Sequence, residues 1–268
     1  MRLFNTIALT VTVATAAHAG ELHSADFILA LDNDHIVTGA IDPDTGSLVF
    51  PSRVKSAVLG AEGFPNFTND PGFNAQLGTL DPGMNIGFDI LAAPRVWNDA
   101  DAHFDDIATE TLTVRAAGQN INAPTADTVV PGIVFGQATL DPAASFHHHL
   151  QYLLNGGLPP AIDGIWLLQI QLWSPSAGID ASDSLYLVFA QGDGEAQLDD
   201  AIAWVEDNLI AQPCPADFNA DGTLNFFDVS AFLTAFNTAD PAADLTNDGA
   251  LNFFDISAFL TAFNQGCP

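Results

Sequence analysis

Residues 214–268, at the end of the chain, contain one sequence written twice. Residues 217–237 read DFNADGTLNFFDVSAFLTAFN, and residues 244–264 read DLTNDGALNFFDISAFLTAFN. The two copies are offset by 27 residues and are identical at 16 of 21 positions. Such self-similarity indicates a duplicated structural unit. It constrains the fold of this chain more tightly than any other feature of the sequence.

Each copy begins with oxygen-bearing side chains at alternate positions of a 12-residue loop, with a glycine at the sixth position. Calcium takes six to eight oxygen ligands, and loops with this spacing supply them. The pattern predicts two Ca²⁺ ions, and the alternative, a pair of Asx-rich surface turns, is disfavoured by the repetition. The predicted ligands are Asp217, Asn219, Asp221, Thr223 (carbonyl), Asn225 and Asp228 in loop one, and Asp244, Thr246, Asp248, Ala250 (carbonyl), Asn252 and Asp255 in loop two.

Apolar residues follow each loop at helical spacing, which predicts one helix after each loop. The residues concerned are Val229, Phe232, Leu233 and Phe236 in the first copy, and Ile256, Phe259, Leu260 and Phe263 in the second. The entering helix of a full EF-hand is missing, because Cys214 and Pro215 directly precede the first loop. The duplicated unit is therefore a loop followed by a helix.

This arrangement resembles a dockerin module over residues 213–268. The resemblance implies a small all-α calcium-binding domain with two antiparallel helices, and a cohesin-type receptor as partner. Phe226–Phe227 and Phe253–Phe254 depart from cellulosomal dockerins, which often have small polar residues there. Basic residues common later in those helices are also absent. The resemblance therefore does not carry over the identity of the receptor.

The two phenylalanine pairs, Phe226–Phe227 and Phe253–Phe254, are predicted to bind a partner. Neighbouring side chains on a helix point about 100° apart, and so small a core cannot take both members of a pair. At least one of each pair is expected to be exposed, and exposed aromatic residues tend to mark partner sites. The alternative is that both pairs seal the module against the rest of the chain.

The chain has two cysteines, Cys214 and Cys267, which bracket the duplicated segment. In an exported chain such a pair predicts a disulfide. A chain-entropy model gives roughly 4 kcal/mol for a closed loop of this size. Flanking cysteines that end in Gly-Cys also resemble the cysteine-clamped GC-type variant of dockerins.

Residues 1–19 are predicted to be a signal peptide. Arg2 supplies the positive end, an apolar run follows, and Ala17-His18-Ala19 offers a cleavage site. The run is too short to span a bilayer, and no other stretch is long and apolar enough. The protein is therefore expected to be secreted, with its module attaching it to an extracellular or cell-surface partner.

The chain carries a formal net charge of −28, with 5 basic residues against 33 acidic ones. Nucleic acid is therefore excluded as a partner, because phosphate binding needs a basic surface. The length predicts two domains, residues 20–212 and 213–268.

Residues 20–212 contain many short β-signals separated by turns, which favour an antiparallel β-sandwich or jelly roll. The predicted strands are 26–31, 35–40, 47–50, 54–59, 85–91, 95–98, 109–115, 129–138, 145–154, 164–173 and 184–190. Residues 62–83 are predicted to form a long loop. One helix is predicted at residues 195–210, with an apolar stripe of Leu198, Ile202, Val205 and Leu209.

His147 and His149 are the strongest candidate site in this domain, because alternate residues of a strand share a face. Two such histidines can chelate Zn²⁺ or Cu²⁺. Pairing with the strand 164–173 would place Gln169, Gln171 and Trp173 beside them. The alternative is the solvent face of a hairpin. His23 could be a third ligand, but no sequence pattern places it near His147 and His149.

The domain also resembles uncharacterised secreted bacterial proteins, some with PEP-CTERM tails. The shared features are His23-Ser24-Ala25-Asp26, Asp70-Pro71-Gly72-Phe73, the His-x-His strand, Asp163-Gly164-Ile165-Trp166 and Ala203-Trp204-Val205-Glu206. This resemblance implies no activity.

Catalytic motifs are missing from the sequence. There is no Gly-x-Ser-x-Gly, no His-Glu-x-x-His and no phosphate-binding glycine loop, so we expect the protein not to be an enzyme. A carbohydrate-binding or carbohydrate-active domain is an alternative, with polysaccharide as partner, since Trp97, Trp166 and Trp173 could stack on sugar rings. The acidic pairs Asp105–Asp106 and Asp199–Asp200 are interpreted as a solvated loop and a helix face.

Overall fold

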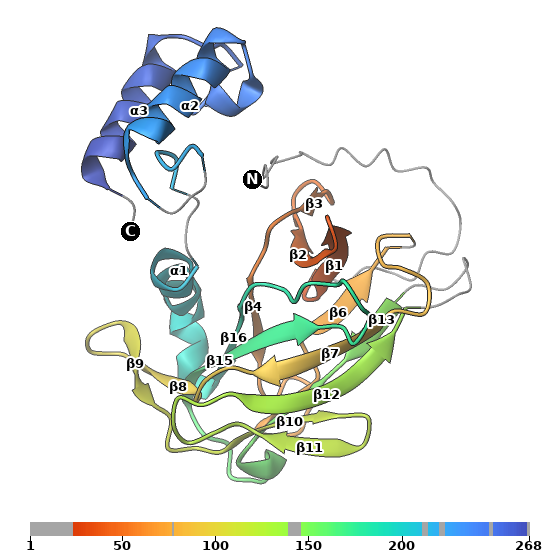
Figure 1. Ribbon diagram of the computed structural model, residues 1–268. Helices are drawn as coiled ribbons and strands as arrows, with labels where there is room; N and C mark the ends of the chain where they lie inside the picture. Colours follow the sequence, from red (N-terminus) through yellow and green to blue (C-terminus); the bar gives the residue numbers. More distant parts are fainter. Residues whose placement is uncertain are drawn as a thin grey trace. The chain divides into compact units, whose positions relative to one another are not determined.

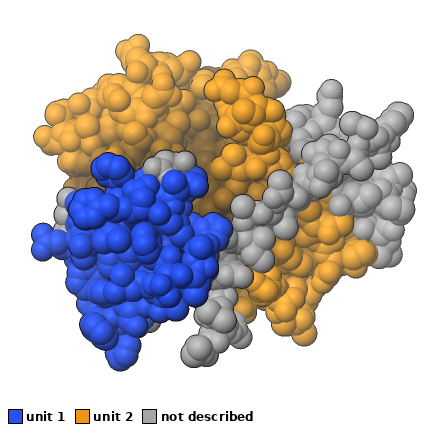
Figure 2. Space-filling view, turned by 90° about the horizontal axis from the view of Figure 1, so that it is seen from above, with its two compact units in different colours: residues 1–15, 210–268 blue, residues 16–209 orange. Residues whose placement is uncertain are grey.

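The computed structural model describes residues 24–76, 78–138, 146–210, 214–219, 223–246 and 249–266. These residues are mainly β with three α-helices (Figure 1). The chain divides between Leu209 and Ile210 into two compact units. The unit that ends at Leu209, orange in Figure 2, is called the first unit here, and the unit that begins at Ile210, blue in Figure 2, is called the second unit. The predicted signal peptide, the linker 211–213 and four predicted site residues lie outside the described residues: His23, Asp221, Asp248 and Cys267.

The first unit, residues 24–209, contains three sheets. The five-stranded sheet has the order β13 (Phe146–His149), β6 (Gly72–Ala75), β1 (Phe27–Asp32), β2 (His35–Ile41) and β3 (Leu48–Val49). The four-stranded sheet has the order β11 (Gln119–Asn122), β10 (Leu112–Ala116), β14 (Gln151–Leu154) and β5 (Phe67–Thr68). The seven-stranded sheet has the order β12 (Val130–Gln137), β7 (Asn85–Ile90), β15 (Gly164–Trp173), β16 (Leu185–Gln191) and β4 (Val54–Val58), while β8 (Arg95–Asn98) pairs with β15 and with β9 (His103–Ile107).

The three sheets enclose one apolar core. Each sheet contributes fully buried side chains to it, such as Phe27 from β1, Tyr152 from β14 and Phe88 from β7. On β15, Trp166, Leu168, Ile170 and Leu172 are buried in this core, while Ile165 and Leu167 on the other face are buried too. At about 25 cal/mol per Å² of apolar surface, such burial is the main source of stability.

Strand β16 is buried along its whole length, which alternation alone does not explain. Helix α1 (Leu198–Asn208) packs on β4 and β16 and covers the face away from the core. Its buried residues are Ala201 and Val205. The predicted helix is confirmed, with its α-helical part starting three residues later because Gly192–Gln197 is a 3₁₀ helix, η2.

The predicted long loop over residues 62–83 is wrong, because it contains β5 and β6. The glycine, asparagine and proline residues of this segment are typical of loops, so its two short strands were not predicted. These strands are stabilised by neighbouring strands that are distant in sequence rather than by their own propensity. Strands β9 and β11 were also missed, so Asp105 and Asp106 lie on a strand and not in a loop. Two pairings, β1 with β6 and β4 with β16, are parallel, so the sheets are not purely antiparallel.

The predicted strand 145–154 is divided at Leu150. Its first half is β13, which pairs with β6, and its second half is β14, which pairs with β10 and β5. Leu150 is fully buried at the junction. The chain therefore passes from the five-stranded sheet to the four-stranded sheet within one predicted strand, which keeps the histidines away from β15.

The second unit contains helix α2 (Phe226–Asn237), a 3₁₀ turn η3 (Pro241–Ala243) and helix α3 (Phe253–Gln265). Phe232 of α2 and Phe259 of α3 stack with ring centroids 4.2 Å apart. They occupy the same position in the two sequence copies, so the core is itself duplicated. Leu233 and Leu260, which belong to the helical spacing of the two copies, are exposed.

Within the described ranges, no helix is both long enough and apolar enough to cross a membrane.

Candidate functional site

The side chains of His147 and His149 lie on one face of β13, as predicted. Their Nε2 atoms are 2.8 Å apart, and their ring centroids are 4.8 Å apart. Phe146 and His148 point the other way, with the His148 ring packed 4.6 Å from that of Phe146. Strand alternation thus divides three consecutive histidines into a facing pair and one packed against aromatic rings.

The neighbours predicted for this pair were wrong. Strand β13 pairs with β6, so His147 lies opposite Asn74 and His149 opposite Gly72. Gln169 and Gln171 lie on β15, where their amides donate to the Ser184 side chain and the Ser182 carbonyl. The prediction assumed that β15 pairs with the preceding strand, but β13, β14 and β15 belong to three different sheets.

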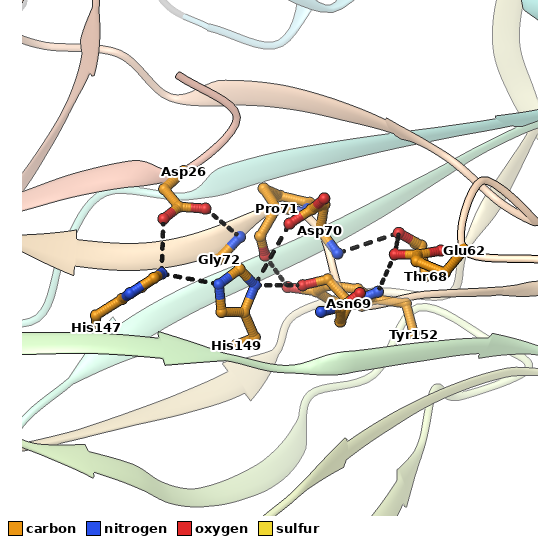
Figure 3. A network of polar contacts seen from close by, with 10 residues as sticks. All are labelled: Asp26, Glu62, Thr68, Asn69, Asp70, Pro71, Gly72, His147, His149 and Tyr152. Carbon is orange, nitrogen blue, oxygen red and sulfur yellow. Dashed lines mark hydrogen bonds and ion pairs between the residues drawn. The ribbon is translucent and has the colours of Figure 1, made fainter. Parts of the chain in front are cut away.

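Asp26 lies beside the histidine pair and was not predicted. It directly precedes β1, and β1 runs parallel to β6 with Phe27 opposite Phe73. Its Oδ2 is 3.3 Å from Nε2 of His147, and its Oδ1 accepts a 3.0 Å hydrogen bond from the Gly72 amide. The Asp26 side chain is fully buried. Figure 3 shows Asp26, His147 and His149 pointing toward one another.

Gly72 allows this close approach. A Cβ atom at this position would lie 2.7 Å from Asp26 Oδ1 and 2.7 Å from His149 Nδ1. No real Cβ atom tolerates such contacts, so any side chain here would push both groups away. The glycine of Asp70-Pro71-Gly72-Phe73 is therefore required by packing around the site and not by a turn.

The ring of His149 is oriented by the segment before β6. Its Nδ1 is 2.7 Å from the carbonyl oxygen of Asn69 and 3.4 Å from Oδ1 of Asp70. A carbonyl oxygen only accepts, so Nδ1 carries the proton and Nε2 acts as the acceptor of the ring. His149 Nε2 lies 2.8 Å from Nε2 of His147, on the side of the ring that faces Asp26 (Figure 3).

A second layer of hydrogen bonds fixes this segment. The Asp70 amide donates to Thr68 Oγ1, and Thr68 Oγ1 and the Asn69 amide both donate to Oε1 of Glu62. The buried Tyr152 hydroxyl donates to the carbonyl of Pro71 at 3.1 Å. The supports of His149 are thus held in place by β14 and by residues before β5.

Burial and nearby groups of the site shift the pKa values of three neighbouring residues, His148, Lys55 and Tyr152. Burial, and to a smaller extent the charges of His147 and His149, lower the pKa of His148. Burial also lowers the pKa of Lys55, while the negative charge of Asp26 opposes that shift. Burial, with Asp70 and Asp26 as further causes, raises the pKa of Tyr152 well above its usual value. Asp26 thus acts on its surroundings as a buried negative charge.

The loops of the second unit bring their predicted oxygen ligands together. In loop two, Thr246 Oγ1 is 2.9 Å from Oδ1 of Asp255 and 3.3 Å from Oδ1 of Asp244. The Gly249 amide donates to Oδ2 of Asp244. Oxygens bound to one calcium ion at 2.3–2.6 Å lie about 3 Å apart. Positions one, three and twelve of this loop therefore lie close together, joined by hydrogen bonds of the Thr246 hydroxyl.

Loop one follows the same plan. Oδ1 of Asp228 accepts from the Asn219 amide at 3.3 Å, and Oδ2 accepts from the Asn225 amide at 2.8 Å. Asp228 and Asp255 are both fully buried. In the second copy, hydrogen bonds led by that of the Asn252 amide lower the pKa of Asp255. Each loop therefore carries a buried carboxylate that accepts backbone hydrogen bonds.

Asn225 and Asn252 have a role beyond the predicted one. Each is the N-cap of its helix and accepts from the second phenylalanine amide, while Asp228 or Asp255 completes a capping box. Their side-chain amides donate to the carbonyls of Thr223 and Ala250. A cap of this kind stabilises a helix by about 1 kcal/mol. The loop and the helix are thus joined by the same residues.

All four predicted partner-binding phenylalanines are exposed. Phe226, Phe227, Phe253 and Phe254 expose 76%, 68%, 73% and 67% of their surface. The prediction that at least one of each pair is exposed is therefore confirmed. Leu233 and Leu260, one turn or more along each helix, are also exposed. Each sequence copy thus presents an apolar surface, which we call the Phe–Phe–Leu surface, made of residues 226, 227 and 233 or 253, 254 and 260.

The tryptophans proposed to stack on sugars are in the wrong place for that role. Trp166 is 1% exposed and Trp97 is 6% exposed. Trp173 is partly buried and donates from Nε1 to Asp89 at 3.0 Å. The residues belong to the core and its edge, which removes the observation that favoured a sugar-binding face.

Cys214 is not a free thiol. Cys267 lies outside the described residues, so the pairing of the two stays a prediction.

Comparisons with known proteins leave the chain unassigned. No family model matches it, and no curated protein matches it. The CooA pilin subunit from enterotoxigenic Escherichia coli has a TM-score of 0.28 at 12% identity, over 55% of this chain and 92% of that one. ACE19, the collagen binding subdomain of Enterococcus faecalis surface protein ACE, has a TM-score of 0.24 at 11% identity, over 53% and 98%. Likeness of this degree assigns neither a fold family nor a function.

Proposed function

We propose that the protein is a secreted anchoring protein, in which residues 213–268 form a calcium-stabilised dockerin-like module that binds a cohesin-type receptor. Residues 20–212 are the cargo that the module attaches to an extracellular or cell-surface assembly. The observation that carries the proposal is the duplication of one loop, one helix and one exposed apolar surface.

Calcium suits the loops because their described donors are oxygens. Two fully buried carboxylates, Asp228 and Asp255, point into loops whose other donors are Asp217, Asn219, Asp244 and Thr246. Without a cation, such carboxylates repel one another. With two ions bound, we expect the loops to gain stability in proportion to RT ln(1 + [Ca²⁺]/Kd). Asp221 and Asp248 would add a further oxygen to each site.

The Phe–Phe–Leu surfaces support a protein partner. An exposed apolar patch on so small a unit is typical of a surface that binds another protein. Large aromatic side chains contribute most of the binding energy at many interfaces. Because both copies carry the same residues, a receptor with one apolar groove could bind either helix. Residues 214–268 contain seven Asp and no Lys or Arg, and this negative charge favours a receptor with a neutral or basic rim.

The test uses the full chain and a receptor purified from the native cell envelope after capture with calcium. Mass spectrometry must identify that receptor as a cohesin-type domain, and affinity is then measured with purified components. Serine at one phenylalanine pair should change the Kd only a few-fold, since the other helix still binds. Serine at both pairs, or chelation of calcium, should abolish binding.

Phe64→Ser is the matched control, because Phe64 is 66% exposed but lies in the other unit. It should leave the Kd unchanged. Loss of binding from a single pair in a folded chain would refute two-way docking. Unchanged binding after replacement of both pairs would refute the proposal that these surfaces contact the receptor. Circular dichroism on every variant separates lost binding from lost folding.

For the cargo, we infer a β-sandwich, with departures from the purely antiparallel pattern at β1–β6 and β4–β16. Three sheets with one shared apolar core support this inference. The signal-like residues 1–19 and the cysteine pair support export, because disulfides persist outside the cytosol. Depletion assays on insoluble polysaccharides would test the alternative of a carbohydrate-binding cargo.

A further inference from the structure

We propose that Asp26, His147 and His149 bind a divalent transition-metal ion in the first unit, with zinc as the metal to test and a fourth coordination position open to solvent. This site is separate from the calcium loops, and the proposal does not depend on the function of the second unit. Sequence analysis pointed to the two histidines, and the structure adds the carboxylate that completes a three-ligand set.

The distances fit a metal centre. In a tetrahedral zinc site with bonds of about 2.0–2.1 Å, neighbouring ligand atoms lie about 3.3 Å apart. The Asp26–His147 contact is 3.3 Å and the His147–His149 contact is 2.8 Å. One ligand atom from each of the three residues lies within 4.8 Å of the others. A zinc ion therefore fits after small side-chain movements.

The ring orientation is set in advance. Metal-binding histidines usually donate their other ring N–H to a carbonyl or carboxylate. His149 does so, with Nδ1 directed at the Asn69 carbonyl and close to Asp70. In the metal-free pair, the proton on Nε2 of His147 points to Nε2 of His149. A metal ion would take the place of this proton.

Charge and access also favour a cation. The buried Asp26 carboxylate accepts from the Gly72 amide through Oδ1 and directs Oδ2 toward Nε2 of His147, so one carboxylate oxygen lies on the side of the imidazoles. The histidine side chains are 30% and 25% exposed, so solvent reaches the site from their side. A ligand set closed by protein on one side and open on the other leaves room for water at the fourth position.

The donor set selects a class of metal. Imidazole nitrogen suits zinc, copper, iron and nickel, whereas calcium and magnesium prefer oxygen alone. Two imidazoles and one carboxylate therefore favour zinc over calcium. Calcium can consequently be used to fill the loops of the second unit without competing at this site.

The experiment titrates zinc into the full chain, without a polyhistidine tag and with calcium in excess, and follows it with a competing chromophoric chelator. We expect one zinc per chain at this site. His147→Ala and Asp26→Asn should each weaken binding by more than the roughly 10–100-fold that changes outside the first shell cost. Because Asp26→Asn keeps the shape of the buried side chain, it guards against loss of folding.

His148→Ala is the matched control, since His148 is the neighbouring histidine on the opposite face of β13. It should leave zinc affinity unchanged. In a ¹⁵N NMR spectrum of the histidine rings, zinc should shift Nε2 of residues 147 and 149, while the Nδ1 proton of His149 remains.

Two results would overturn the proposal. The first is a chain that binds no zinc beyond the His147→Ala variant, which would leave a hydrogen-bonded histidine pair and nothing more. The second is equal loss of affinity in His148→Ala and His147→Ala, which would place the metal elsewhere. Unchanged affinity in a folded Asp26→Asn variant would remove the carboxylate from the ligand set.

Discussion

Replacing Gly72 by alanine tests whether Asp26 and His149 pack as closely as the structure shows. The new Cβ would lie 2.7 Å from Asp26 Oδ1 and from His149 Nδ1. To reach an ordinary contact of 3.4 Å, each group would have to move by about 0.7 Å. Metal–ligand distances tolerate about 0.2 Å. The substitution should therefore damage the metal site through its geometry alone.

The size of the effect follows from two separate costs. Overpacking by one methyl group in a well-packed region costs about 1–3 kcal/mol. For a unit of this size, each kcal/mol lowers Tm by about 2–4 °C. Displaced ligands should lower zinc affinity by about 10-fold or more, as lost orientation of ligands does elsewhere. Calorimetric melting with and without zinc measures both costs on the same sample.

Gly136→Ala is the control, because its new Cβ would press on the face of β13 opposite to the metal site. Its Cβ would lie 2.6 Å from Cδ2 of His148 and 2.7 Å from Cε2 of Phe146. We expect it to lower Tm by a similar amount and to leave zinc affinity unchanged. Gly72→Ala protein with unchanged Tm and unchanged zinc affinity would show that the packing described around residue 72 is not that of the molecule in solution.

Further predictions concern the stability of the two units. Cys214→Ser should lower the free energy of unfolding of the second unit by roughly 4 kcal/mol, and with it the Tm of that unit, with little effect on the first unit. Non-reducing mass spectrometry that finds two free thiols would refute the disulfide. Phe232→Ala should cost about 3–5 kcal/mol, which for a unit this small is most of its stability; calorimetry should show the second transition lost without calcium and partly restored with it. Tyr152 should stay protonated in the folded chain at pH values where unfolded tyrosine ionises, since burial raises its pKa. Its contribution to stability is complete below about pH 10 and is lost as pH rises through the folded pKa. Phenolate absorbance should therefore appear with unfolding, and Tyr152→Phe should remove that part of the alkaline loss.

The sequence was sufficient to predict local features. The repeat predicted two loop–helix units, and two helices are found, which begin at Phe226 and Phe253, within the last three positions of each predicted loop. Strands β8 and β15 were predicted with their exact ends. In these segments, hydrophobic periodicity, capping residues and turn signals all favour the same structure.

Short strands held by distant partners could not be predicted. β6 reads Gly-Phe-Asn-Ala, which has little strand propensity, yet it is buried between β1 and β13. Strand propensity mostly measures packing against neighbours, and the neighbours were unknown. The same limit explains the error at Leu150, where one run of strand-forming residues serves two sheets.

The metal site illustrates the difference between finding residues and placing them. His147 and His149 were found from alternation, which is a local rule, whereas Asp26 reaches them through the parallel β1–β6 pairing and the antiparallel β6–β13 pairing. A carboxylate about 120 residues away in sequence cannot be selected by charge alone among 33 acids. One feature of the sequence, the set of motifs that carries the resemblance of the first unit, did include Asp26.

Asp26 of the first motif, Gly72 of Asp70-Pro71-Gly72-Phe73 and the His-x-His strand are far apart in sequence, yet β1, β6 and β13 bring them to one place (Figure 3). Asp26 supplies the carboxylate, Gly72 the space and His149 the oriented ring. Because each motif has a separate role in one network, a change in any of them should affect the same measurement, zinc affinity. Packing alone predicts no such agreement, since His148 lies on β13 and Gly136 packs against it, yet neither should affect zinc affinity.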